Sequence, residues 1–131
     1  IGSPDYFARR SVPKRLEDLA DHSCLNYRHA SHSDLFRWSF RQGERRIEMA
    51  VKGPLIADDA HVLIEAALAG QGLIYLFEPF VSEHLAAGCL RTCLEEFCPL
   101  WSGYHLYYPG RHQKSAALAA LVDYLQSRKL R

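Results

Sequence analysis

The chain of 131 residues lacks the features that mark membrane, secreted and nucleic-acid-binding proteins. No run of 18 apolar residues occurs, so no segment is expected to cross a membrane. The first residues, IGSPDYFARR, have neither the apolar stretch of a secretory signal nor an initiating Met, so we expect a fragment without a leader. Sixteen basic side chains nearly balance 15 acidic ones, whereas a nucleic-acid-binding domain usually has a strong basic excess.

Cysteine is scarce, with four residues in the chain. This density is low for a secreted disulfide scaffold, so reduced thiols and a cytoplasmic location are expected. Cys89 and Cys93 fall at even spacing in a predicted strand, 89–94, where both would face one side and pack as small apolar groups. His29 and His32 have no third ligand nearby. We therefore expect neither a metal site nor a cofactor.

Motifs of catalysis and of nucleotide binding are also missing. No serine stands in a Gly-x-Ser-x-Gly motif or another activating context, so an enzyme is not expected. The sequence Gly70-Gln71-Gly72 follows a predicted helix, whereas a phosphate-binding loop precedes one. These glycines are therefore predicted to end that helix, with Gly70 or Gly72 in the left-handed conformation.

The apolar patterns that are present predict an α/β fold in which strands and helices alternate. Helices are predicted over 5–9, from 13 to 20, over 59–69, over 78–87 and from 115 onward. Strands are predicted over 24–28, 36–42, 46–53, 54–57, 73–77, 89–94 and 104–109, with an irregular linker over 95–103. The strands over 36–42 and 46–53 form a hairpin that turns at Gly43. The remaining order is that of a doubly wound unit.

The predicted helix over 59–69 is apolar on two sides. One stripe covers the sheet and contains Ala60, Leu63, Ile64, Ala67 and Leu68. A second side consists of Val62, Ala66 and Ala69 and requires another cover, either within the domain or on a partner. Asp58 and Asp59 stand where an acidic side chain caps a helix.

Short motifs run through nearly the whole chain in a fixed order. They are Ser3-Pro-x-Tyr6, LEDLADHSCLNYR over 16–28, Trp38-x-Phe40, Gly53-x-Leu55-x-x-Asp58-Asp59, Ala66-Ala67-Leu68-Ala69-Gly70-x-Gly72, Leu85-x-x-Gly88-x-Leu90, Tyr108-Pro109 and LAALVDYL over 118–125. Each is weak alone, but the ordered set resembles the effector-binding domain of LysR-type transcriptional regulators. Two positions depart from that pattern: Asp58 is often Asn in the family, and the sequence over 76–78 often reads Leu-Pro.

The resemblance implies a type-2 periplasmic-binding-protein fold, in which two Rossmann-like lobes flank a cleft and two crossing segments join them. Residues 1–94 would form the second lobe, and residues 95–131 a crossing segment with the strand and helix that return to the first lobe. The other residues of the first lobe would precede residue 1. A winged helix-turn-helix would also precede it and would be the only part that binds DNA.

The function implied is an effector-sensing and oligomerisation module, in which a small metabolite such as an organic acid binds between the lobes and modulates transcription. The alternative is a stand-alone solute-binding protein of the same fold. Because open α/β sheets bind ligands at the carboxyl ends of strands, the predicted effector site comprises Gly2, Ser3, Ala57, Asp58, His61, Leu76 and Phe77. The alternative role for Asp58 and Asp59 is to cap the helix only.

The resemblance also implies a homodimer or a higher homo-oligomer, without membrane contact. Val62, Ala66 and Ala69 would lie in the interface, unless they are buried inside the lobe. The last helix carries Leu118, Leu121, Val122 and Leu125 on one face. We expect another chain or copy to cover that face. Burial of these leucines by residues 1–94 alone would contradict the two-lobe interpretation.

Overall fold

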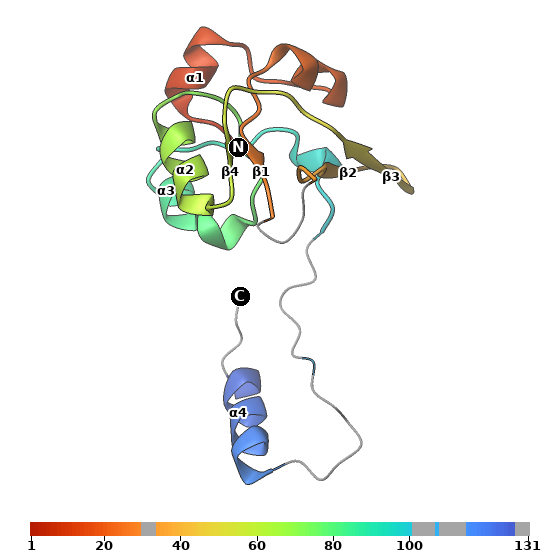
Figure 1. Cartoon of the computed structure of the whole chain (residues 1–131), viewed down its shortest axis with the longest axis vertical. Coiled ribbons are helices and arrows are strands. Elements are labelled where there is room, and N and C mark those ends of the chain that lie inside the picture. Colours follow the sequence, from red (N-terminus) through yellow and green to blue (C-terminus); the bar gives the residue numbers. More distant parts are fainter. Residues whose placement is uncertain (30–33, 101–106, 108–114, 128–131) are drawn as a thin grey trace. The chain divides into compact units, whose positions relative to one another are not determined.

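The computed structural model describes residues 1–29, 34–100, 107 and 115–127 (Figure 1). Its contacts form two units, Ile1–Pro99 and Leu100–Arg131. The first contains α1 (Pro4–Arg9), η1 (Leu16–Asp21), β1 (Asn26–Tyr27), β2 (Trp38–Gln42), β3 (Arg45–Met49), β4 (Ile56–Ala57), α2 (Ala60–Leu68), η2 (Glu78–Phe80), α3 (Ser82–Ala86) and η3 (Glu95–Phe97); each η element is a 3-10 helix. The second contains α4 (Ala116–Ser127). None of the helices in the described ranges has both the length and the apolar character needed to span a membrane.

A short parallel sheet organises the first unit. β1 pairs in parallel with β4, with Tyr27 opposite Ala57. On the other side of β1, Cys24 forms a parallel bridge with Leu73. The segments that start at residues 24, 55 and 73 therefore run side by side in one direction, as expected for a doubly wound unit.

The N-terminal residues extend this sheet. Ile1 and Ile74 exchange both backbone hydrogen bonds, at 3.0 and 2.8 Å. Gly2 forms an antiparallel bridge with Arg91. The order of paired backbone segments is thus β4, β1, the segment at Leu73, the N-terminus and the segment at Arg91, with the N-terminus antiparallel to its neighbours.

The two faces of the sheet carry two cores because successive residues of a strand point to opposite sides. Cys24 and Leu73 face a core that also contains Tyr6, Leu16, Leu19, Trp38, Phe40, Val51 and Leu94. Leu25 and Ile74 face a core that also contains Leu63, Ile64, Ala67, Val81 and Leu90. Accordingly, α2 and α3 lie on one side of β1 and β4, and the β2–β3 hairpin lies on the other (Figure 1).

The predicted hairpin forms, although its strands, over 38–42 and 45–49, are shorter than the predicted 36–42 and 46–53. β2 and β3 are antiparallel, and Gly43 turns the chain with a φ of 60°. Trp38 and Phe40 are buried, whereas Arg37 and Arg41 are exposed. Aromatic residues at alternate positions suit a strand that is covered on one face only.

The bounds of α2 are set by its two caps. Asp59 begins the helix, and its Oδ1 accepts a hydrogen bond from the His61 amide at 2.7 Å. Gly70 has a φ of 69° immediately after the helix, so the predicted left-handed position belongs to Gly70 rather than Gly72. The Arg9 guanidinium donates to the Gly70 carbonyl at 2.6 Å, which places a cation at the helix C-terminus and fastens α1 to it.

Two predicted strands are less regular than expected. The segment over 73–77 has a single bridge, at Leu73, because Ile74 pairs with the N-terminal residue instead of a strand. The segment over 89–94 has a single bridge, at Arg91. The prediction that Cys89 and Cys93 both pack on one face was therefore wrong: without a continuous strand, Cys89 is exposed and only Cys93 is partly buried.

Predicted helices also differ in detail. The segment over 78–87 is divided into η2 and α3, because Val81 leaves helical geometry and is fully buried. The segment from Pro13 forms η1 instead of an α-helix, and it begins only at Leu16. The linker over 95–103 starts with η3 rather than irregular chain. The predicted strand over 104–109 lies outside the described residues, except for Tyr107.

Candidate ligand-binding site

The carboxyl ends of the parallel segments meet at one edge of the sheet, termed here the carboxyl edge. The backbone pairing of β1 with β4 continues one residue beyond β1, because the Arg28 amide donates to the Ala57 carbonyl at 2.9 Å. α2 begins three residues after Ala57. The carboxyl edge therefore combines strand ends with a helix N-terminus, the position at which open α/β sheets bind ligands.

Three of the predicted site residues lie together at this edge. Ala57 ends β4 and is partly buried, Asp58 follows it and is exposed, and His61 is exposed in the first turn of α2. The capping role belongs to Asp59, so the carboxylate of Asp58 is not used in that cap.

Leu76 and Phe77 belong to the neighbouring segment. Leu76 and Ala57 both pack against the core that contains α2. Phe77 is the N-cap residue of η2, and 52% of its surface is exposed. A large apolar side chain that is half exposed is available for contact with a ligand.

Gly2 and Ser3 are placed differently. Both are buried, and Ser3 is only 2% exposed. The Ser3 hydroxyl accepts a hydrogen bond from the Tyr6 amide at 3.3 Å and so caps α1. A Cβ atom on Gly2 would overlap the Leu73 side chain. These two residues have a structural role in joining the N-terminus to the sheet.

A cluster of rings next to the carboxyl edge was not included in the predicted site. The centroids of the His29 and Tyr27 rings lie 5.1 Å apart, and those of His29 and Phe36 lie 6.1 Å apart. Phe36 is in turn 6.0 Å from Tyr75, whose hydroxyl donates to the Ser39 carbonyl at 2.6 Å. Burial raises the pKa of Tyr75. The aromatic residues at alternate positions of the hairpin sequence, Phe36, Trp38 and Phe40, were the available signal for this cluster.

Two motif residues, Tyr6 and His22, make a contact away from the carboxyl edge. The Tyr6 hydroxyl lies 2.9 Å from His22 Nδ1 and accepts a hydrogen bond from the Ser23 amide at 3.0 Å. Burial lowers the pKa of His22 and raises that of Tyr6. A neutral imidazole with an unprotonated Nδ1 accepts a hydrogen bond from the Tyr6 hydroxyl, so the contact joins α1 to the end of η1.

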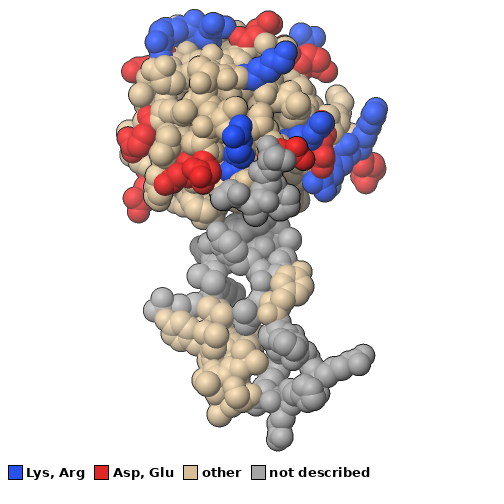
Figure 2. Space-filling view, in the orientation of Figure 1, with Lys and Arg blue, Asp and Glu red and all other residues tan. Residues whose placement is uncertain are grey.

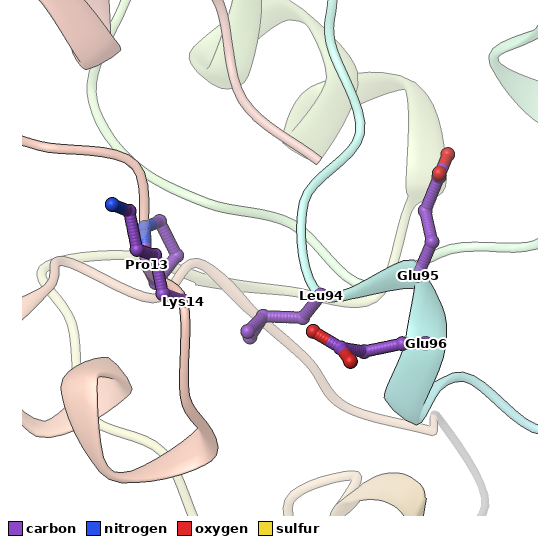
Figure 3. Close-up of a pocket in the computed structure, with 5 residues that line it drawn as sticks. All are labelled: Pro13, Lys14, Leu94, Glu95 and Glu96. Carbon is purple, nitrogen blue, oxygen red and sulfur yellow. The ribbon is translucent and has the colours of Figure 1, made fainter.

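A surface hollow of about 450 Å³ is lined by Pro13, Lys14, Leu94, Glu95 and Glu96 (Figure 3). Figure 3 shows the Glu96 side chain extending alongside Leu94, while Glu95 points away. Leu94 adopts a φ of 58°, which is rare for a residue other than glycine. No predicted site residue lines this hollow.

Charge and metal-binding capacity are limited in the described part of the chain. Figure 2 shows basic and acidic side chains interspersed over the visible face, in keeping with the net charge of +1. No three His, Cys, Asp or Glu side chains among the described residues come together as metal ligands do. Burial raises the pKa of the Cys24 thiol to about 12, which makes a thiolate ligand unfavourable there.

The apolar residues predicted to lie in an interface are largely uncovered. Val62 is 47% exposed, Ala69 is exposed and Ala66 is partly buried against the core. In the second unit, none of the described residues of α4 is buried, and Leu121 is 47% exposed. Among the described residues, the second apolar side of α2 and the apolar face of α4 are therefore not fully covered within their own units.

Comparisons with known proteins identify the same architecture. The family model for the LysR substrate binding domain matches residues 1–129. The chain is 36% identical over 126 residues to the HTH-type transcriptional regulator PgrR of Escherichia coli, covering 96% of this chain but only 42% of PgrR.

Two solved structures agree with that match. The regulatory domain of AphB from Vibrio vulnificus superposes with a TM-score of 0.71 at 21% identity, over 96% of this chain and 61% of that one. CrgA, a LysR-type transcriptional regulator from Neisseria meningitidis, gives a TM-score of 0.66 at 25% identity, over 76% of this chain and 33% of that one. The fold is thus the α/β fold of type-2 periplasmic binding proteins.

Proposed function

The chain belongs to the LysR substrate-binding-domain family, and from this premise we propose that it is the effector-sensing and oligomerisation module of a transcriptional regulator. The observation that carries the proposal is the carboxyl edge. There the ends of β1 and β4 and the start of α2 present Asp58 and His61 to solvent. A small metabolite that binds here would alter transcription by favouring one arrangement of the regulator over another.

The proposal also assigns parts of this chain to the two lobes of the complete protein. Residues 1–94 form one lobe, and residues 95–131 form a crossing segment and a return to the other lobe. The contacts divide five residues later, after Pro99, because Phe97 of η3 packs against the core of the first unit. Contact with DNA is assigned to residues outside this chain, and a sensor of this kind needs no catalytic group.

The test is a thermal-shift screen of small organic acids on the complete gene product. A compound at 100 times its Kd stabilises a native state by about 2.7 kcal/mol, which gives a measurable rise in melting temperature. Asp58→Ala is expected to reduce the rise while leaving the unliganded melting temperature unchanged. The capping alternative predicts the reverse: an unchanged rise and a lower unliganded melting temperature.

Oligomerisation is proposed to use the outer face of α2. Val62, Ala66 and Ala69 are small, lie on one side of the helix and are not fully covered by the rest of the unit. Small side chains allow two helices to approach closely, and burial of their apolar surface drives association. The partner is a second copy of the chain.

A further inference from the structure

Two side chains of opposite charge stand at neighbouring strand ends of the carboxyl edge. Arg28 directly follows β1, and Asp58 directly follows β4. The hydrogen bond from the Arg28 amide to the Ala57 carbonyl involves the peptide that leads to Asp58. The backbone therefore holds the two residues next to each other.

Neither side chain is committed to another described residue. The ion pairs within the described ranges are Arg15–Asp18 and Arg46–Glu48, and neither Arg28 nor Asp58 makes a side-chain hydrogen bond there. Both residues are exposed. Arg28 is nevertheless held in place, because its backbone pairs with Ala57 on one side and with Leu35 on the other.

The chemistry of this pair selects among small molecules. A guanidinium group binds a carboxylate through two parallel hydrogen bonds, and an aspartate binds an ammonium group through a charge-assisted one. A molecule with two carboxylates would be attracted to Arg28 but repelled by Asp58. A molecule with one carboxylate and one ammonium group satisfies both residues.

Aromatic rings near Arg28 indicate the chemistry of the uncharged part of the ligand. His29 follows Arg28 directly, and its ring lies 5.1 Å from Tyr27 and 6.1 Å from Phe36, centroid to centroid. Ring faces and edges favour contact with flat or branched apolar groups. Strand residues alternate in direction, so the Arg28 side chain points to the side of the core that contains Cys24, and Phe36, which packs against that core, is the ring that an apolar substituent would contact.

We infer that the effector is a zwitterion of the α-amino-acid type with an apolar side chain, whose carboxylate binds Arg28 and whose ammonium group binds Asp58. This inference rests on the proposed function, since it assigns a chemical class to the molecule sensed at the carboxyl edge. It replaces a simple organic acid by an amino acid as the expected effector.

The experiment measures binding to the complete gene product by calorimetry, using matched probes. L-phenylalanine is compared with 3-phenylpropionate and phenethylamine, and L-leucine with 4-methylpentanoate and 3-methylbutylamine; succinate represents the dicarboxylates. We expect at least one amino acid to bind, and to bind roughly tenfold or more tightly than both of its analogues, because each analogue lacks the charged group that binds either Asp58 or Arg28.

Two variants assign the charges, and their melting temperatures show that they fold. Asp58→Asn is expected to bring the Kd values of the amino acid and its carboxylate analogue to within about threefold of each other. The variant would then have lost most of the roughly tenfold preference for the amino acid. Arg28→Gln is expected to remove the preference of the amino acid over its amine analogue. Arg41→Gln and Glu44→Gln, which change exposed charges on the hairpin, should preserve both preferences.

Three outcomes would overturn the inference. If succinate or a carboxylate analogue binds as tightly as every amino acid, the inference falls but the sensing function stands. If Asp58→Asn leaves the preference for the amino acid unchanged, the ammonium group binds elsewhere. If no probe of any class binds, both the inference and the proposed function are contradicted.

Discussion

Gly72 lies where the chain re-enters the sheet against the backbone of Ser23. The Leu73 amide donates to the Ser23 carbonyl at 2.8 Å. A Cβ atom on Gly72 would overlap that carbonyl oxygen and would press on the Leu25 side chain. Gly88 has a different constraint: its φ is 72°, but a Cβ atom there would meet nothing within 4 Å. At Gly72 a side chain is excluded by neighbouring atoms, whereas at Gly88 it is disfavoured only by the backbone conformation.

We predict that Gly72→Ala destabilises the protein more than Gly88→Ala does. The first change forces a backbone shift in the sheet, at a cost of about 1–3 kcal/mol or more. The second places alanine in the left-handed region, at a cost of roughly 1–2 kcal/mol. Urea unfolding of the complete gene product measures both. Equal losses would mean that the close approach at Gly72 is not retained in solution.

Individual residues could be predicted from the sequence where the reason is local. Asp59 and Gly70 stand at the two ends of a periodic apolar pattern, so their roles follow from unsatisfied backbone groups and from φ alone. The exposure of Cys89 could not be predicted in this way. It depends on how the segment around Arg91 pairs with Gly2, which is far away in the sequence.

At the scale of elements, α2 has more apolar surface than its own unit buries. Leu63, Ile64 and Ala67 are buried in the core of the sheet. Val62, on another side, remains 47% exposed. The apolar character of both sides could be read from the sequence, because it depends only on helical spacing. The sequence also predicted which side covers the sheet, and the burial of Leu63, Ile64 and Ala67 agrees with that prediction.

We predict that Val62→Glu converts the oligomer of the complete gene product into monomers. A carboxylate in an apolar helix contact would lose its hydration without gaining a partner. Sedimentation velocity measures the change. Ser82→Glu, at an exposed position in α3, is the matched control and should leave the oligomer intact. Persistence of the oligomer in Val62→Glu would place the interface elsewhere.

The short strands were the elements least accessible from the sequence. β1 and β4 span only two residues each, and the segments at Leu73 and Arg91 have a single bridge each. The apolar runs in the sequence predicted longer strands at these places. Such runs indicate that a segment is buried on two faces, but they do not indicate how many backbone hydrogen bonds it forms. The hairpin was predicted more accurately, since alternation over five-residue strands is a stronger signal.

At the scale of the whole molecule, α4 requires an apolar surface that the described residues of its own unit do not provide. No described residue of α4 is buried, although Leu118, Leu121 and Leu125 lie at helical spacing. Each large apolar side chain left in solvent forgoes roughly 1.5–3 kcal/mol of burial. We propose that another chain or copy, or other residues of the complete protein, cover this face.

We predict that Leu121→Glu lowers the melting temperature of the complete gene product by several degrees. The neighbouring change Ala120→Glu alters the same helix at an exposed position and should have little effect. Differential scanning calorimetry compares the two variants. Equal melting temperatures for both variants and the unmodified protein would show that the Leu121 face of α4 remains in solvent.

The central claim is that the carboxyl edge of the sheet binds the effector. Hydrogen–deuterium exchange of the complete gene product, with and without a compound that binds in the screen, tests it most directly. Slower exchange is expected over 55–61 and 73–77, because a ligand there would stabilise the strand ends and the first turn of α2. Slower exchange confined to the hollow over 13–14 and 94–96, with none at the carboxyl edge, would contradict it.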